Sequence, residues 1–318
     1  MDIVECVPNV SDGRHPEVVD WCAHAVADVP GIRLLDRTSD ADHDRSVLTF
    51  AGDVVAVSTA MRALATEAIA RIDLRQQHGR HPRIGALDVA PFVPVGETPM
   101  TTCVRLAQEF GAWLADRYRI PVYLYAAAAR RPDRRILADI RRPAFEGLLE
   151  ALRAPDGRPD FGPARPHPTA GATVAGARPF LVAWNIQLDT RDLTVARAIA
   201  RAIRERDGGL PAVQALGIRL DALGCVQVSM NLLDVARTPM WLVLERVTAL
   251  AGASGVGVVD SELIGLAPLR AFLDVADHIG VAGDARANDQ RVMAAARWLR
   301  IRDASARMAF ELRLAETT

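Results

Sequence analysis

This sequence contains no lysine, and all 38 of its basic residues other than histidine are arginine. A chain without lysine has no side-chain amine that could form a Schiff base with a substrate carbonyl or with pyridoxal phosphate (PLP). It also lacks the lysine of a Walker A phosphate loop and the lysine of a protein kinase. These absences exclude all of these enzyme classes and leave chemistry carried by histidine, carboxylates, hydroxyl groups, arginine or a metal.

Charge excess and long apolar runs are missing as well. The 38 arginines balance 39 acidic residues to a net charge of −1, which predicts neither nucleic acid nor an anionic membrane as a partner. No run approaches the roughly 18 apolar residues of a membrane helix. The first ten residues carry two acids and no base, unlike a secretory signal, so we expect a cytoplasmic protein.

Cysteine is scarce and scattered. The four cysteines form no C-x-x-C pair, and they are Cys6, Cys22, Cys103 and Cys225. This spacing predicts buried free thiols and favours neither a disulfide framework nor a zinc site.

The order of elements predicts an α+β protein. A length of 318 residues corresponds to roughly two domains. Short apolar strands alternate with amphipathic helices, which predicts two α/β subdomains with mixed or antiparallel sheets, over residues 1–178 and 179–318. The arginine- and proline-rich residues 130–168 are expected to form a long loop.

The stretch 76–92 has the most unusual composition. It places His78, Arg80, His81 and Arg83 on a loop broken by glycine and proline, directly before a predicted strand. Catalytic groups concentrate on loops between rigid elements. Because histidine titrates near neutrality, it can take and return a proton in one catalytic cycle. We therefore expect this loop to carry function.

A second candidate is the acidic stretch 36–45, which contains His43 among the carboxylates Asp36, Asp40, Asp42 and Asp44. A carboxylate could orient a catalytic imidazole. The same residue types could bind a metal ion. A solvated hairpin loop is the third interpretation, and the residues alone leave the three open.

The third candidate is the stretch 160–178. Gly162, Gly171 and Gly176 would allow a ligand to approach the backbone closely. No G-x-G-x-x-G motif follows a strand here, so dinucleotide binding has little support. His167 lies between two prolines and is expected to be exposed.

Together these stretches resemble the formiminotransferase family over nearly the whole chain. The resemblance rests on VECVPNVSDG (4–13), LLDRTSDADHDRSVLTFAG (34–52), HGRHPRIGALDVAPFVPV (78–95) and CVQVSMNLLD (225–234). It implies two α/β subdomains with a folate tunnel between them and a glutamate formimidoyltransferase without the fused cyclodeaminase. It also implies a homodimer that acts in one-carbon metabolism and histidine degradation.

The resemblance implies transfer of a formimidoyl group between N-formimidoyl-L-glutamate and N5 of tetrahydrofolate, the co-substrate. The catalytic histidine of the family falls on His81, which would take the N5 proton as general base and return it as general acid. Asp40 is expected to orient the imidazole, with Asp42 and Asp36 as alternatives. The reaction requires neither a metal nor PLP.

The resemblance also implies the residues that contact folate and the donor. The folate-binding loop of the family falls on 162–171. The full set comprises Asn9, Ser11, Asp42, Arg45, His78, Arg80, Arg83, Gly162, Pro163, Thr169, Ala170, Gly171 and Arg178.

Ala170 stands where animal members of the family carry tryptophan, and two residues beside His81 depart from the family pattern as well. Arg80 stands where the family usually has glutamate, and His78 stands where it has lysine. A cation beside His81 should favour its neutral form and lower its pKa, and it could clamp an additional carboxylate or phosphate. Two alternatives stay open: a folate-dependent formimidoyl or formyl transferase acting on another amine, such as glycine or a biosynthetic intermediate, and a folate-binding protein without catalysis.

Overall fold

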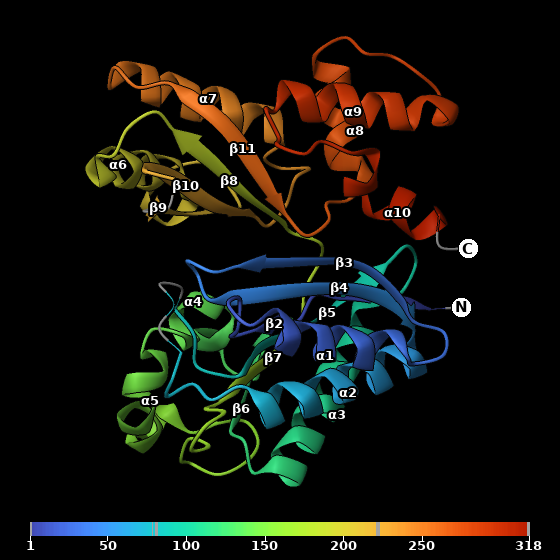
Figure 1. Ribbon diagram of the computed structural model, residues 1–318, viewed down its shortest axis with the longest axis vertical. Coiled ribbons are helices and arrows are strands. Elements are labelled where there is room, and N and C mark those ends of the chain that lie inside the picture. Colours follow the sequence, from blue (N-terminus) through green and yellow to red (C-terminus); the bar gives the residue numbers. More distant parts are fainter. Residues whose placement is uncertain (1, 78, 80–81, 221–222, 317–318) are drawn as a thin grey trace. The chain divides into compact units, whose positions relative to one another are not determined.

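The structure, a computed structural model, describes residues 2–77, 79, 82–220 and 223–316. The predicted site residues His78, Arg80 and His81 therefore lie outside the described residues. The chain divides into two compact units, Met1–Pro179 (unit 1) and Phe180–Thr318 (unit 2). Unit 1 contains a mixed sheet and unit 2 an antiparallel sheet, each with helices (Figure 1). The predicted α+β class with two subdomains is confirmed.

Unit 1 is built on a seven-stranded sheet in the order β1-β4-β2-β5-β7-β6, with β3 paired to β4. Its strands are β1 (Ile3–Cys6), β2 (Asn9–Val10), β3 (Arg33–Asp40), β4 (Arg45–Asp53), β5 (Leu87–Val95), β6 (Val122–Ala126) and β7 (Thr173–Ala177). Strand β7 runs parallel to β5 and β6, whereas the other pairings are antiparallel.

Helices cover both faces of the sheet of unit 1. Its α-helices are α1 (Pro16–Ala27), α2 (Val54–Arg71), α3 (Met100–Tyr118), α4 (Leu137–Ile140) and α5 (Ala144–Arg153). Leu124 of β6 belongs to the core cluster beneath α1, α2 and α3, whereas its neighbours Tyr123 and Tyr125 pack with Leu148 and Leu152 of α5. Because side chains alternate along a strand, these two clusters lie on opposite faces of the sheet.

The prediction of a continuous loop over residues 130–168 was wrong, because α4 and α5 lie within it. Leu148 and Leu152 are four residues apart, which places them on one face of α5, where both are buried. The arginines and prolines around this short helix hid its apolar period.

Unit 2 is built on a four-stranded antiparallel sheet in the order β11-β8-β10-β9. Its strands are β8 (Val182–Leu188), β9 (Val213–Leu220), β10 (Cys225–Leu232) and β11 (Val258–Ile264), and its α-helices are α6 (Leu193–Ile203), α7 (Met240–Ala253), α8 (Leu269–His278), α9 (Asn288–Trp298) and α10 (Phe310–Glu316). Trp184 of β8 is fully buried in the core beneath these helices. Asn185 and Gln187 lie on the opposite face of the same strand, and both are buried although they are polar.

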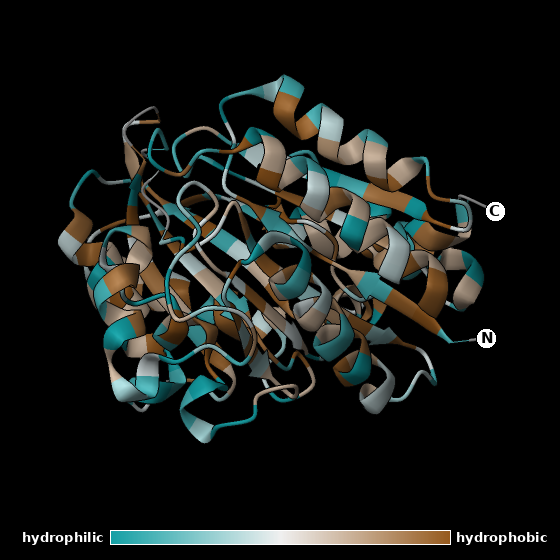
Figure 2. Cartoon of the chain, turned by 90° about the horizontal axis from the view of Figure 1, so that it is seen from below, coloured by the Kyte–Doolittle hydropathy of each residue, from teal (hydrophilic) through white to brown (hydrophobic). Residues whose placement is uncertain are grey.

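The helices show the amphipathic pattern that the sequence predicted, with hydrophobic and hydrophilic residues side by side on the same coils (Figure 2). Among the described residues, no helix has the length and apolar composition needed to cross a membrane. All four cysteines are free, and Cys6, Cys22 and Cys103 are buried. Cys225 is only partly buried, so the expectation of burial was wrong for this thiol.

The start of α2 gives a prediction about stability. Asp53 caps the helix, since its Oδ1 accepts hydrogen bonds from the backbone N–H groups of Val55 and Ala56, both at 2.9 Å. We expect Asp53→Ala to lower the free energy of unfolding by about 1 kcal/mol, measured by chemical denaturation. Asp53→Asn keeps a side-chain acceptor and should stay close to the unchanged protein. Equal losses in both variants would contradict the capping role.

Candidate active site

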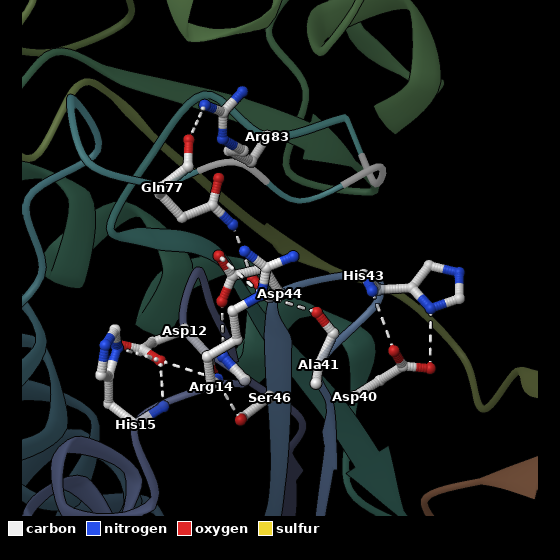
Figure 3. A network of polar contacts seen from close by, with 11 residues as sticks. Asp12, Arg14, His15, Asp40, Ala41, His43, Asp44, Ser46, Gln77 and Arg83 are labelled. Carbon is white, nitrogen blue, oxygen red and sulfur yellow. Dashed lines mark hydrogen bonds and ion pairs between the residues drawn. The ribbon is translucent and has the colours of Figure 1, made fainter. Parts of the chain in front are cut away.

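The turn between β3 and β4 holds a carboxylate–imidazole pair. Asp40, the last residue of β3, accepts a hydrogen bond from the backbone N–H of His43 at 2.8 Å. The second oxygen of the Asp40 carboxylate lies 2.7 Å from Nδ1 of the His43 ring. The spacing of three residues lets one aspartate close the turn and orient the ring. Figure 3 shows both contacts.

The electrostatics of this pair keep the carboxylate ionised. Burial opposes ionisation and by itself raises the pKa of Asp40. The His43 ring, the backbone N–H groups and the charge of His43 act in the opposite direction, so the pKa lies below its ordinary value. An ionised Asp40 selects the ring tautomer that carries its proton on Nδ1. No specific role for His43 followed from the sequence, although the D-x-x-H spacing was a usable signal.

The loop after β2 is hydrogen-bonded to this turn. Gly13 donates its backbone N–H to Oδ1 of Asp44 at 3.1 Å, and the Ser46 hydroxyl donates to the Asp12 carbonyl at 2.6 Å. A Cβ on Gly13 would overlap with the carbonyl oxygen of Asp40. Only glycine therefore allows the loop and the turn to lie this close together.

His15 in the same loop gives a prediction about pH. Its Nδ1 lies 3.0 Å from a carboxylate oxygen of Asp12, and this hydrogen bond raises the pKa of His15. Because the folded-state pKa is raised, protonated His15 stabilises the fold below its unfolded pKa of about 6.5, and that contribution is lost as pH rises through the folded value. An NMR titration should show His15 titrating higher in the unchanged protein than in Asp12→Asn. Identical titrations would contradict the pairing.

The loop that carries His81 is attached to the same turn. Gln77 donates its side-chain amide to the carbonyl of Asp44 at 2.6 Å. A Cβ on Gly79 would overlap with the carbonyl oxygen of His43, so the two backbones are in close contact. The described residues on the N-terminal side of His81 therefore lie against the Asp40–His43 turn.

Arg83 anchors the other end of this loop. Its Nη2 donates to the carbonyl of Gln77 at 2.9 Å, and its guanidinium forms two bonds to the carboxylate of Glu146 in α5, at 2.8 and 3.2 Å. We predicted a ligand contact for Arg83. Its described contacts join Gln77 to α5, and Figure 3 shows the contact with Gln77; the ligand contact stays a prediction.

The glycines of the predicted folate loop approach the chain's own backbone. A Cβ on Gly171 would overlap with the carbonyl oxygen of Ile84, and a Cβ on Gly162 would crowd the carbonyl oxygen of Ile120. Both glycines have a positive φ, +66° and +86°, which other residues rarely adopt. Gly171 pairs with Gly85, just before β5, whereas Gly162 lies beside Ile120 and the end of α3.

Residues 167–170 form a tight turn that joins the start of β5. Ala170 accepts a hydrogen bond from Ala86, and the Thr169 carbonyl accepts one from Leu74. Nδ1 of His167 accepts from the backbone N–H of Ala170 at 3.0 Å. His167 is half-buried, and burial lowers its pKa. The expectation that it would be exposed was wrong, because its ring closes this turn.

Four other predicted site residues have described positions, one within the Asp40–His43 turn and three outside it. Ser11 is buried and donates its hydroxyl to the carbonyl of Gly85 at 2.7 Å. The side-chain amide of Asn9 donates to the Val7 carbonyl at 2.8 Å. Asp42 lies within the Asp40–His43 turn. Arg178 follows β7 and donates from Nη1 to the Pro179 carbonyl at 3.0 Å.

Unit 2 contains a polar pocket of about 510 Å³ that we did not predict. It lies where β8 ends and where β10 and β11 begin, with Gln187, Asp260, Arg302 and Cys225 in its lining. With its amide in the orientation that satisfies both atoms, Gln187 donates to Asp260 and accepts from Arg302, each at 2.7 Å. The sequence signal that could have predicted this pocket is the run of polar residues at alternate positions of two adjacent strands. Over the described part of the chain, no group of three or more His, Cys, Asp or Glu could hold a metal ion.

Comparison with known proteins identifies the family. Residues 3–178 match "Formiminotransferase domain, N-terminal subdomain", and residues 183–302 match "Formiminotransferase domain". The glutamate formimidoyltransferase of Streptococcus pyogenes is 41% identical over 276 residues, and that of Thermoplasma acidophilum is 44% identical over 280 residues. Each alignment covers 87% of this chain and 92% of the relative. The formimidoyltransferase-cyclodeaminase of Sus scrofa is 45% identical, over 86% of this chain and 52% of that protein. The chain belongs to the formiminotransferase family.

Proposed function

We propose that the chain transfers a formimidoyl group between N-formimidoyl-L-glutamate and N5 of tetrahydrofolate. The family match over both units supports this function, as does the identity of 41% and 44% to two glutamate formimidoyltransferases. One structural observation supports the proposed active site. The loop bearing His81 is fastened by Gln77 and Gly79 to a turn that holds an ionised Asp40.

The chemistry needs one group that moves a proton. N5 of the folate attacks the amidine carbon of the donor and forms a new C–N bond, which gives a tetrahedral intermediate. The bond from this carbon to the glutamate nitrogen then breaks and releases glutamate. His81 takes the proton from N5 and delivers it to the leaving nitrogen, so that the proton count balances. The role of His81 rests on the family resemblance, because this residue lies outside the described residues.

Asp40 has a described partner that bears on its predicted role. We expected its carboxylate to support His81, and its contacts are with His43. We propose that Asp40 holds the turn in the shape that the His81 loop packs against. In this role Asp40 positions the His81 loop, and His81 alone transfers the proton.

A donor panel tests the proposed function. The purified chain would be incubated with tetrahydrofolate and with the N-formimidoyl derivatives of L-glutamate, L-aspartate and glycine. Production of 5-formimidoyl-tetrahydrofolate would be followed by absorbance. We expect the highest kcat/KM with the glutamate derivative. A higher value with glycine would favour the paralogue that Arg80 suggests, and folate binding without transfer from any donor would favour the non-catalytic alternative.

The homodimer and the folate tunnel implied by the family resemblance stay predictions. Sedimentation equilibrium measures the first directly, because a dimer has twice the 34.4 kDa mass of the chain.

A further inference from the structure

The polar pocket of unit 2 is formed at a β-bulge. The pairing of β11 with β8 shifts register between Val258 and Ser261. Between those two pairs β11 has two residues, Val259 and Asp260, where β8 has only Gln187. Both residues of the bulge line the pocket. Because bulges redirect side chains and are frequent beside functional sites, this one brings a carboxylate and an apolar side chain to the same cavity.

Asp260 is held in a network with Gln187 and Arg302. The Gln187 amide bridges the two charged groups with two contacts of 2.7 Å, and Nε of Arg302 lies 3.4 Å from a carboxylate oxygen of Asp260. Nη2 of Arg302 also lies 3.8 Å from the carboxylate of Glu262. Gln187 is 4% exposed, so a buried amide fixes the positions of both charged groups before any ligand arrives. The contacts that the structure describes for Arg302 use Nε and Nη2 and leave Nη1 for a ligand.

A second arginine, Arg191, lies at the exposed rim of the pocket. Its Nε donates to the carbonyl of Gly224 at 3.1 Å, which holds the guanidinium beside the start of β10. Gly224 has a φ of +63°, and a Cβ there would come within 3.2 Å of Nη2 of Arg191. Glycine therefore allows this close approach, and Arg191 keeps its two Nη groups for a ligand at the rim.

The charges in the lining of the pocket are balanced. Among its described lining residues, Asp189 and Asp260 are acidic, and Arg191 and Arg302 are basic. A lining that contains both signs disfavours a polyanion such as a nucleotide phosphate, because each carboxylate would repel it. It suits a ligand that itself carries both signs. Guanidinium groups bind carboxylates with charge-assisted hydrogen bonds, and carboxylates bind an ammonium or a planar amidinium in the same way.

Two apolar side chains complete the lining. Leu223 is 56% exposed and Val259 is 53% exposed, and both line the pocket. Small-molecule sites combine apolar walls with a few placed polar groups, and their volumes are roughly 300–1,000 Å³. The volume of this pocket, about 510 Å³, lies within that range. Leu223 and Val259 would cover the carbon chain of a ligand whose charged ends reach the arginines and Asp260.

We propose that this pocket binds an amino acid with two carboxylates and one nitrogen cation, either an ammonium or an amidinium. The two carboxylates pair with Arg302 and Arg191, and the cation pairs with Asp260. L-glutamate and N-formimidoyl-L-glutamate both have this chemistry. Their choice as ligands rests on the proposed function, in which the second is the donor and the first is the product. The pocket selects the amino-acid partner, and proton transfer stays with His81.

Cys225 provides a probe of occupancy that needs no turnover. It lines the pocket and is the one cysteine of the four that is only partly buried. Burial and the charge of Asp260 raise the pKa of Cys225, and Arg302 opposes the shift. Labelling with N-ethylmaleimide is therefore run at mildly alkaline pH, where more thiolate forms. A ligand at about ten times its Kd leaves roughly one site in ten free, so it should slow labelling of Cys225 about tenfold.

Arg302→Gln tests the recognition, with Arg270→Gln as the matched control. Arg270 lies on α8, its side chain is 72% exposed, and it pairs with Asp274, so its loss leaves the pocket intact. We expect Arg302→Gln to raise the Kd of the bound amino acid, measured by calorimetric titration, by roughly 10–100-fold, as for the loss of a hydrogen bond to a charged group. Arg270→Gln should leave the Kd unchanged. If circular dichroism shows that Arg302→Gln does not fold, Arg191→Gln takes its place under the same criteria.

A series of compounds separates the two sources of the ligand. Protection of Cys225 by N-formimidoyl-L-glutamate alone assigns the pocket to the donor, and protection by L-glutamate alone assigns it to the product. Glutarate has both carboxylates and no cation, so it should protect far less than either. Equal protection by glutarate, protection by tetrahydrofolate alone, or no protection by any of these compounds would overturn the proposal.

The pocket and the proposed function can fail separately. If the unchanged protein transfers no group but an amino acid of this class protects Cys225, the proposed function fails and the binding site stands. If the protein transfers the group and neither amino acid protects Cys225, the binding site fails and the proposed function stands.

Discussion

Replacing His81 with alanine is expected to lower kcat by about 10²–10⁴-fold, the usual contribution of a general acid–base group. In the proposed reaction the imidazole takes the proton from N5 of the folate and returns it to the leaving nitrogen. No lysine exists in the chain that could substitute for it. Single-turnover formation of 5-formimidoyl-tetrahydrofolate measures the step directly.

The control for this prediction is His24→Ala, because His24 is exposed on α1 and lies outside the proposed machinery. Tetrahydrofolate should bind His81→Ala with nearly the affinity of the unchanged protein, as measured by calorimetry. Turnover that survives in His81→Ala would remove this residue from the catalytic role. A loss of folate binding together with turnover would instead make it a binding residue.

Asp40→Asn is expected to lower kcat by roughly 10²-fold or more with little change in KM. The substitution removes the charge that faces Nδ1 of His43 at 2.7 Å and presents an amide there. An amide that turns its N–H₂ toward the ring reverses the tautomer of the imidazole. The turn against which Gly79 packs would then no longer hold its shape.

A double-mutant comparison decides how Asp40 acts. If it works through His43, then Asp40→Asn, His43→Ala and the double variant should lose similar activity, because residues that act as a unit are not additive. If Asp40 supports His81 directly, His43→Ala should be mild and Asp40→Asn severe. A large loss in Asp42→Asn with a mild loss in Asp40→Asn would transfer the role to Asp42.

Much of the fold followed from local patterns. The strand expected after the stretch that carries His81 agrees with β5, and the amphipathic helices expected between strands agree with α1, α2 and α3, because apolar periods are encoded in neighbouring residues. The two-residue strand β2 and the short helix α5 were missed. Both are too short for a period to emerge, and packing against other elements stabilises them.

The candidate site shows the same division. The composition of 36–45 and 76–92 marked both segments, since histidines, arginines and aspartates gather there. Their attachment depends on contacts between residues distant in sequence, such as Gln77 with Asp44. The partner of Asp40 also required coordinates, because four nearby carboxylates have equal claims on an imidazole in the sequence alone.

The sequence by itself determined the class of chemistry. The absence of lysine excluded Schiff-base and P-loop mechanisms, and the family motifs pointed to a reaction moved by histidine. Only the tertiary structure decided the electrostatics: that Asp40 is paired with His43, and that Arg141 is paired with the buried Asp88. Charges interact according to distance and burial, and neither quantity is set by position along the chain.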